Sequence, residues 1–121
     1  MDQEKAINIE QNNDVVIVNF NIASISSVSD IEQIAAQLRD FVDRYGPQRI
    51  VVDFTGVKFF SSQMLGLLVD IWKKLRDNDG LIAISGINPG LTRVFRITNL
   101  DRLFKFYPDL NSAVKGISKQ P

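Results

Sequence analysis

The sequence contains no cysteine and no histidine. The first absence excludes disulfide bonds, thiolate metal sites and cysteine nucleophiles, because each of these needs a thiol. The second absence excludes the Ser-His-Asp triad of many hydrolases. One enzymatic alternative remains, a serine nucleophile with Lys58 or Lys73 as its base, but no further catalytic group accompanies that pair. We therefore expect a protein that is not an enzyme, with no catalytic residue, metal or cofactor.

The sequence also lacks an excess of either charge and any long apolar run. Its 14 Lys and Arg residues balance its 14 Asp and Glu residues, whereas a nucleic-acid-binding protein needs a basic excess to neutralise phosphates. No apolar stretch approaches the roughly 20 residues of a membrane-spanning helix. The first ten residues, MDQEKAINIE, have no apolar core like that of a secretory signal. We therefore expect a cytoplasmic protein that binds no nucleic acid and does not insert into a membrane.

What is present indicates one α/β domain. A chain of 121 residues with 45% hydrophobic residues is long enough to bury its own core. Short apolar and β-branched segments predict five strands, in KAINIE, VVIVNF, RIVVDF, LIAIS and LFKFY. Between them, apolar residues recur with helical spacing, so the predicted order is β-β-α-β-α-β-α-β-α. This alternation predicts a mixed sheet with helices packed against it.

Local signals predict where these elements begin and end. Ser29 and Glu32 have the spacing of a capping box, which places the start of the first helix at Ser29. The preceding segment, NIASISSVS, has no clear period and is expected to be a loop. A final helix is expected after Pro108, and residues 116–121 are expected to form a frayed tail.

The predicted helix from Ser62 to about Asp77 has more apolar residues than one buried face requires. One stripe suits packing on the sheet and contains Leu65, Leu68, Val69, Trp72 and Leu75. A second stripe contains Met64, Leu67 and Ile71. This second stripe either packs on a neighbouring helix or forms an exposed patch that docks a partner. Glycine weakens a helix by about 1 kcal/mol relative to alanine. We therefore expect that another part of the protein approaches the helix closely at Gly66 and requires the glycine there.

Ser61 and Ser62 stand side by side where this helix begins, in the segment KFFSSQMLG. A serine at this position can cap the helix, because the first backbone N–H groups of a helix lack partners. The same N–H groups and the helix dipole also accommodate an anion. A phosphate on either hydroxyl would add about 1.5 to 2 negative charges beside Met64. Such a charge could repel a docked partner while the fold stays intact.

The segment DFTGVKFFSSQMLGLL resembles the signature of STAS domains, the family of bacterial anti-sigma-factor antagonists. The family pattern is Asp-Phe-Ser-Gly-Val, an apolar pair, and then Asp-Ser-Ser-Gly-Leu-Gly. The later segment INPGLTRVFRITNLDRLFKFYPDLNSAV also resembles the family. The resemblance covers nearly the whole chain and implies a single STAS-like domain over residues 1–121. It further implies that Ser62 is phosphorylated by an anti-sigma factor that is itself a serine kinase, and that a serine phosphatase resets it.

The sequence departs from the family pattern around the phosphorylation site that the resemblance implies. Ser61 stands where the family has Asp, Gln63 replaces a second Ser or Thr, and Met64 replaces Gly. The resemblance implies two site classes, phosphorylation at Ser62 or Ser61, and partner binding through Ser26, Phe60, Gln63, Met64 and Leu67. An alternative implied by the altered motif is a STAS-like assembly subunit of a signalling or lipid-transport complex that is not regulated by phosphorylation. A homodimer formed through a sheet edge is a further expectation.

Overall fold

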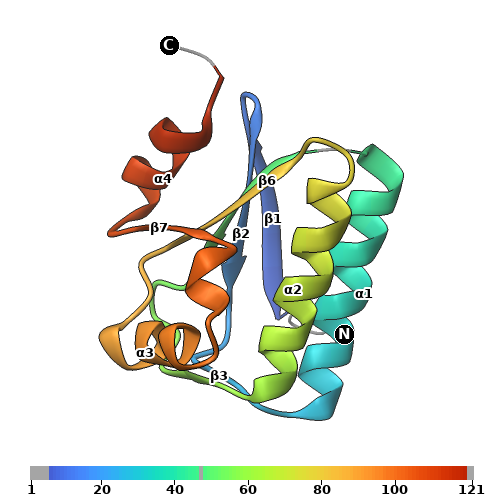
Figure 1. Ribbon diagram of the computed structural model, residues 1–121. Helices are drawn as coiled ribbons and strands as arrows, with labels where there is room; N and C mark the ends of the chain where they lie inside the picture. Colours follow the sequence, from blue (N-terminus) through green and yellow to red (C-terminus); the bar gives the residue numbers. More distant parts are fainter. Residues whose placement is uncertain (1–5, 47, 120–121) are drawn as a thin grey trace.

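The computed structural model describes residues 6–46 and 48–119. Their central feature is a sheet with α1 and α2 side by side on one face and α4 on the other (Figure 1). The elements are, in chain order, β1 (Ile7–Asn12), β2 (Val15–Phe20), β3 (Ser24–Ile25), α1 (Val28–Tyr45), β4 (Arg49–Asp53), β5 (Phe59–Phe60), α2 (Ser62–Arg76), β6 (Leu81–Ser85), α3 (Pro89–Ile97), a 3-10 turn (Leu100–Arg102), β7 (Lys105–Tyr107) and α4 (Leu110–Ile117).

The five-stranded sheet is mixed, with the order β1-β2-β4-β6-β7. β1 pairs with β2 in the antiparallel sense, and the remaining neighbours are parallel. The predicted α/β class, with a mixed sheet and helices packed against it, is therefore confirmed. β2 lies inside the sheet, because its first four residues, Val15–Val18, are apolar on both faces and all buried.

Two hydrophobic cores form on the two faces of the sheet because successive strand residues point in opposite directions. In β2, Val16 and Val18 contribute to the larger core, which α1, α2 and α3 cover. Val15 and Ile17 contribute to a smaller core on the other face. α4 covers this second face with Ala113 and Ile117, which α4 brings to the same side because they are four residues apart.

A second, two-stranded sheet was not predicted. β3 pairs in parallel with β5, with Ser24 opposite Phe59 and Ile25 opposite Phe60. The loop predicted for NIASISSVS is therefore wrong at Ser24–Ile25. Two residues are too few for alternation to be visible in a sequence, and the pairing depends on a segment about 35 residues further on.

The start of the first helix also differs from its prediction. α1 begins at Val28, and Ser27 is its N-cap, since the Ser27 Oγ accepts a hydrogen bond of 3.0 Å from the Asp30 N–H. The capping box expected at Ser29 is therefore wrong by two residues. Ser27 and Ser29 each precede an acidic residue by three positions, so the spacing alone does not distinguish them. The other predicted helix starts agree with the structure at Ser62 and after Pro108.

The end of the chain is ordered further than the sequence indicates. α4 continues to Ile117, whose side chain is buried on the sheet. The carboxylate of Asp14 then accepts hydrogen bonds from the Ser118 Oγ and the Lys119 N–H, each of 2.7 Å. The frayed tail predicted for residues 116–121 is thus wrong for 116–119, and residues 120–121 lie outside the described part.

Candidate functional site

The first turn of α2 is held in place by the small β3–β5 sheet. The Ser61 N–H donates a hydrogen bond of 2.9 Å to the carbonyl oxygen of Ile25 in β3. One strand residue earlier, the side chain of Phe60 packs against the rings of Phe54 and Phe95, with centroid distances of 5.6 and 5.9 Å. These contacts fix the position and direction in which α2 starts.

Ser61 is the N-cap residue of α2, but its hydroxyl does not cap the helix within the described residues. Its backbone has the extended conformation of an N-cap, and its carbonyl oxygen accepts from the Met64 N–H at 3.0 Å. The Ser61 Oγ is buried and has no hydrogen-bond partner among the described residues. A buried hydroxyl cannot reach a phosphate donor, so Ser61 is inaccessible as a phosphorylation site in this conformation.

Ser62 is the first residue of α2, and its side chain is exposed. The neighbouring Gln63 and, beyond the β3–β5 sheet, Ser26 are exposed as well. The Ser26 Oγ lies 3.5 Å from the Ser24 Oγ. Of the two adjacent serines, Ser62 is therefore the one whose hydroxyl another protein can reach.

Three residues expected to bind a partner are not on the surface. Phe60, Met64 and Leu67 have exposed fractions of 5%, 0% and 4%, and all three belong to the larger core. The second apolar stripe of α2 therefore packs within the protein, where α1 lies beside α2. The prediction of an exposed docking patch made of Met64 and Leu67 is therefore wrong. It failed because the sequence of α2 does not show where α1 lies.

Gly66 is exposed, and the close approach expected there is also wrong. A Cβ added at Gly66 would meet no described atom within 4 Å. The absent side chain instead leaves room in a surface groove of about 470 Å³ between α1 and α2. We call it the α1–α2 groove, and its lining residues are Val28, Ile31, Glu32, Ala35, Arg39, Gln63, Gly66, Leu67 and Asp70.

The α1–α2 groove begins at Gln63, next to Ser62, and contains both apolar and charged groups. An ion pair of 2.7 Å between Arg39 and Asp70 joins the two helices at its other end. Val28 has a side chain that is 58% exposed, and Phe59, three residues before Ser62, is 52% exposed. Sequence reasoning missed Val28 and Phe59. Strand alternation could have indicated that Phe59 points outward once Phe60 is assigned to the core.

The Asp-Phe-Thr-Gly part of the family-like segment has a structural role. The Oδ1 of Asp53, a residue that is 8% exposed, accepts hydrogen bonds from the Thr55 Oγ1 at 2.8 Å and the Ser85 Oγ at 2.9 Å. A Cβ at Gly86 would collide with the Thr55 Oγ1. These contacts fasten the turn after β4 to the end of β6, and the chain leading to β5 and Ser62 starts from this turn.

Over 6–46 and 48–119, no helix combines the length and the apolar character needed to cross a lipid bilayer. The same residues contain no cluster of three or more potential metal ligands of the carboxylate type. Lys58 and Lys73 are both exposed.

Comparison with known proteins identifies the family. The family model described as the STAS domain matches residues 6–113, which is most of the chain. The chain belongs to the STAS domain family.

Individual relatives agree with this assignment. A Thermotoga maritima protein provisionally assigned as an anti-sigma factor antagonist is 29% identical over 75 residues, which cover 62% of this chain and 66% of the relative. The chain thus spans slightly less than two thirds of that relative. The anti-sigma F factor antagonist of Paenibacillus polymyxa is 24% identical over 113 residues, covering 93% of this chain and 92% of the relative. A solved STAS domain protein from Planctomyces limnophilus, 23% identical, superposes with a TM-score of 0.84 over 93% of this chain and 97% of its own, which shows the common fold.

Proposed function

We propose that this STAS domain is an anti-sigma-factor antagonist. It acts in the cytoplasm as a one-domain binding module and not as an enzyme, and its partner is an anti-sigma factor that is also a serine kinase. Phosphorylation of Ser62 releases the partner, and a serine phosphatase restores binding. The observation that carries the proposal is the exposed hydroxyl of Ser62 at the start of α2, beside the α1–α2 groove.

The fold can accept a phosphate on Ser62. The residue is exposed, and it lies at the positive end of the α2 dipole, where free backbone N–H groups favour a negative group. The bond that anchors this turn, from the Ser61 N–H to the Ile25 carbonyl, uses backbone atoms only. Modification of the Ser62 side chain therefore leaves the anchor unchanged.

A docked partner would tolerate the phosphate poorly. Exposed apolar side chains near Ser62, those of Val28 and Phe59, offer contact area to a partner. The groove also contains the carboxylate of Glu32, whereas the carboxylate of Asp70 is paired with Arg39 at the far end. A phosphate on Ser62 would add about 1.5 to 2 negative charges. Docking would remove water from these charges without supplying a positive group to pair with them. Phosphorylation should therefore weaken docking.

The test compares Ser62→Asp and Ser62→Ala with the wild-type chain. Each tagged protein is expressed in the organism from which its gene comes and is purified from those cells. Proteins that co-purify with it are identified by mass spectrometry. We expect Ser62→Asp to lose the anti-sigma factor and Ser62→Ala to retain it, with both thermal midpoints close to that of wild type. Incubation of the wild type with the captured partner and ATP should place phosphate on Ser62.

Asn111→Asp is the matched control. Asn111 is exposed in the first turn of α4, so this variant adds a negative charge at a helix start on the other face of the sheet. It should retain the partner. Equal partner recovery by Ser62→Asp and wild type would refute phosphorylation control.

A second candidate function is a STAS-like assembly subunit of a signalling or lipid-transport complex without phosphorylation control. The specific observation in its favour is Ser61, which replaces the family's Asp and directs a buried hydroxyl inward, so no carboxylate stands beside Ser62. A fixed partner held equally by Ser62→Ala and Ser62→Asp would select this function.

The proposal includes self-association as a further property. β1 is the terminal strand of the sheet order, and a terminal strand can pair with a second copy of the same strand. Light scattering across a range of concentrations tests this, and a constant monomer mass would exclude it.

A further inference from the structure

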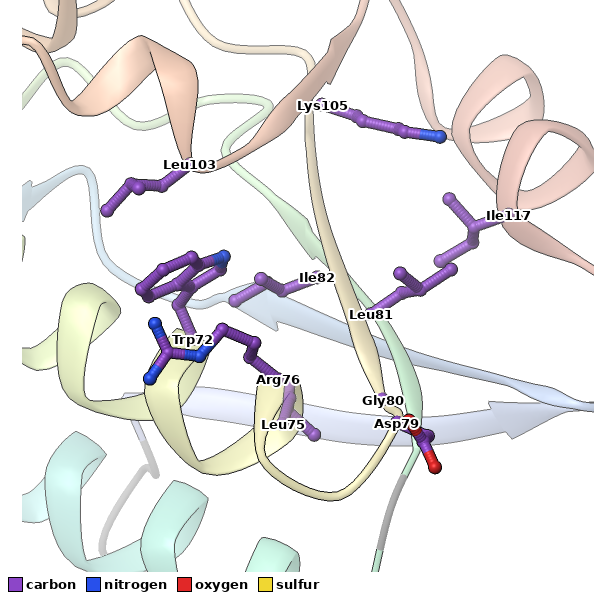
Figure 2. A pocket seen from close by; sticks show the side chains of 10 residues that line it. All are labelled: Trp72, Leu75, Arg76, Asp79, Gly80, Leu81, Ile82, Leu103, Lys105 and Ile117. Atoms are coloured by element: carbon purple, nitrogen blue, oxygen red, sulfur yellow. The ribbon is translucent and has the colours of Figure 1, made fainter.

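A pocket at the β7 edge of the sheet is separate from the α1–α2 groove. Among the residues that the structure describes, β7 pairs only with Ala83–Ser85 of β6, so the first two residues of β6, Leu81 and Ile82, extend beyond it. The last turns of α2 flank this notch on one face of the sheet, and α4 flanks it on the other (Figure 2). The resulting pocket has a volume of about 350 Å³.

The walls of the pocket are mainly apolar. Figure 2 shows Trp72 and Leu103 on one side, Ile117 on the other, and the β6 residues between them. The volume lies at the lower end of the range of roughly 300 to 1,000 Å³ that is usual for small-molecule sites. The shape therefore suits a small ligand with an aliphatic part.

The positively charged groups at the rim of the pocket differ in whether they already have an interaction partner. The Arg76 guanidinium already bonds to Asp77 at 3.1 Å and lies 4.6 Å from the centre of the Trp72 ring. Lys105 extends from the start of β7 toward α4 (Figure 2), and it makes no ion pair or side-chain hydrogen bond with any described residue. An ammonium group beside apolar walls attracts a negative head group.

Asp79 also lines the pocket, but it lies at the end away from Lys105 (Figure 2). The charge of one ammonium group, that of Lys105, is balanced by a singly charged anion such as a carboxylate.

We propose that this pocket binds a medium-chain carboxylate, with the anion at Lys105 and the aliphatic chain against Trp72, Leu103 and Ile117. This site goes beyond the proposed function. It lies at the C-terminal end of α2, a helix of 15 residues that Ser62 begins, so roughly 20 Å separate Ser62 from Arg76 at the pocket. The ligand therefore does not compete with a partner at the α1–α2 groove.

The sole tryptophan of the sequence is the reporter, because Trp72 lines the pocket. The full chain is titrated with hexanoate, octanoate and decanoate while its fluorescence is recorded, and calorimetry gives the stoichiometry. We expect a saturable change at one ligand per chain, with affinity rising roughly fourfold for each added methylene. 1-Octanol and octyltrimethylammonium, which lack the negative charge, should bind at least roughly tenfold more weakly than octanoate.

Variants of Lys105 locate the anion. Lys105→Gln should weaken octanoate binding roughly tenfold, and Lys105→Arg should largely retain it. Lys115→Gln is the matched control, since it removes an exposed lysine of α4 outside the pocket, and it should bind octanoate like wild type. Lys105 is exposed, so its substitution should leave the thermal midpoint unchanged.

Three outcomes would overturn the proposal: no saturable fluorescence change, 1-octanol binding as tightly as octanoate, or Lys105→Gln binding like wild type. Ser62→Asp should bind octanoate normally. A failure at this pocket therefore leaves the proposed function untouched, and the reverse also holds.

Discussion

At the scale of single residues, two glycines and one buried carboxylate differ sharply in how well they should tolerate substitution. Gly66 lies in an exposed helical position with open space where a Cβ would project. Gly86 has a φ of +64° and would collide with the Thr55 Oγ1 if it carried a side chain. The same turn depends on Asp53, whose single Oδ1 accepts from Thr55 and Ser85.

Gly66→Ala should stabilise the protein by about 0.5 to 1 kcal/mol, because alanine removes the entropic cost of glycine in a helix without a clash. Urea unfolding measures the change. Gly86→Ala, the contrasting variant, should destabilise by about 1 to 3 kcal/mol, since alanine adopts a left-handed backbone poorly. A loss of stability in Gly66→Ala would contradict the open space at that position.

Asp53→Ala should lower the free energy of unfolding by about 2 to 4 kcal/mol. The substitution leaves the Ser85 hydroxyl buried without its acceptor and removes hydrogen bonds to a charged group, each of which contributes about 1.5 to 3 kcal/mol. Denaturant unfolding gives the value. Asp101→Ala, which removes an exposed carboxylate, should change stability by no more than about 0.5 kcal/mol.

At the scale of elements, short pairings decide where helices begin and end. The two residues of β3 anchor the start of α2, and the β1–β2 turn holds the residues that follow α4 through Asp14. The hydrogen bonds to Asp14, first from the Lys119 N–H and then from the Ser118 hydroxyl, lower the pKa of its carboxyl below the usual value. Each pairing joins segments that are far apart in the sequence.

The contact between Asp14 and the end of α4 should depend on pH. Because the pKa of Asp14 is lowered in the folded state, its contribution to stability is present above the usual carboxyl pKa of about 3.9. The contribution is lost as the pH falls through the lowered value. We expect hydrogen exchange at the Lys119 amide, corrected for its intrinsic pH dependence, to lose protection in that acidic range.

Asp14→Asn provides the comparison for this effect. Asparagine keeps the size of the side chain but removes its charge, so protection at Lys119 should be weak at neutral pH and nearly independent of pH. Identical protection profiles in the two proteins would show that the carboxylate does not hold the end of α4.

At the scale of the whole molecule, one sheet separates two cores of unequal size. The smaller core consists of four strand residues and the two α4 residues that cover them, Ala113 and Ile117. The stability of that face should therefore depend strongly on one short helix. The larger core is covered by α1, α2 and α3.

Ile117→Ala should destabilise the protein by about 2 to 5 kcal/mol, as expected for a large-to-small change at a buried isoleucine. Thermal unfolding measures the effect. Ile97→Ala is the matched control, because Ile97 is 72% exposed, and it should change stability by about 0.5 kcal/mol at most. Equal effects of the two substitutions would indicate that α4 contributes little to the fold.

The sequence predicted most of the architecture and only part of the site. VVIVNF was recognisable as an inner strand because Val15–Val18 are apolar in succession, and the start of α2 was recognisable from Ser61 and Ser62. The orientation of side chains at that start was not. The burial of Met64 depends on where α1 lies, and the inward direction of the Ser61 hydroxyl depends on the pairing of β5 with β3. Both are consequences of contacts between segments that no local pattern encodes.

The pairing of β3 with β5 has a consequence for the speed of recognition. The Lys58 N–H bonds to the Ala23 carbonyl at 2.7 Å, and the Ser61 N–H bonds to the Ile25 carbonyl at 2.9 Å. These hydrogen bonds join the segment that precedes α1 to the segment that precedes α2. Because these backbone hydrogen bonds already join the two segments in the free protein, we expect this side to lose little conformational freedom when a partner binds. Association should then be limited by diffusion and orientation, with a rate that does not wait for a loop to rearrange.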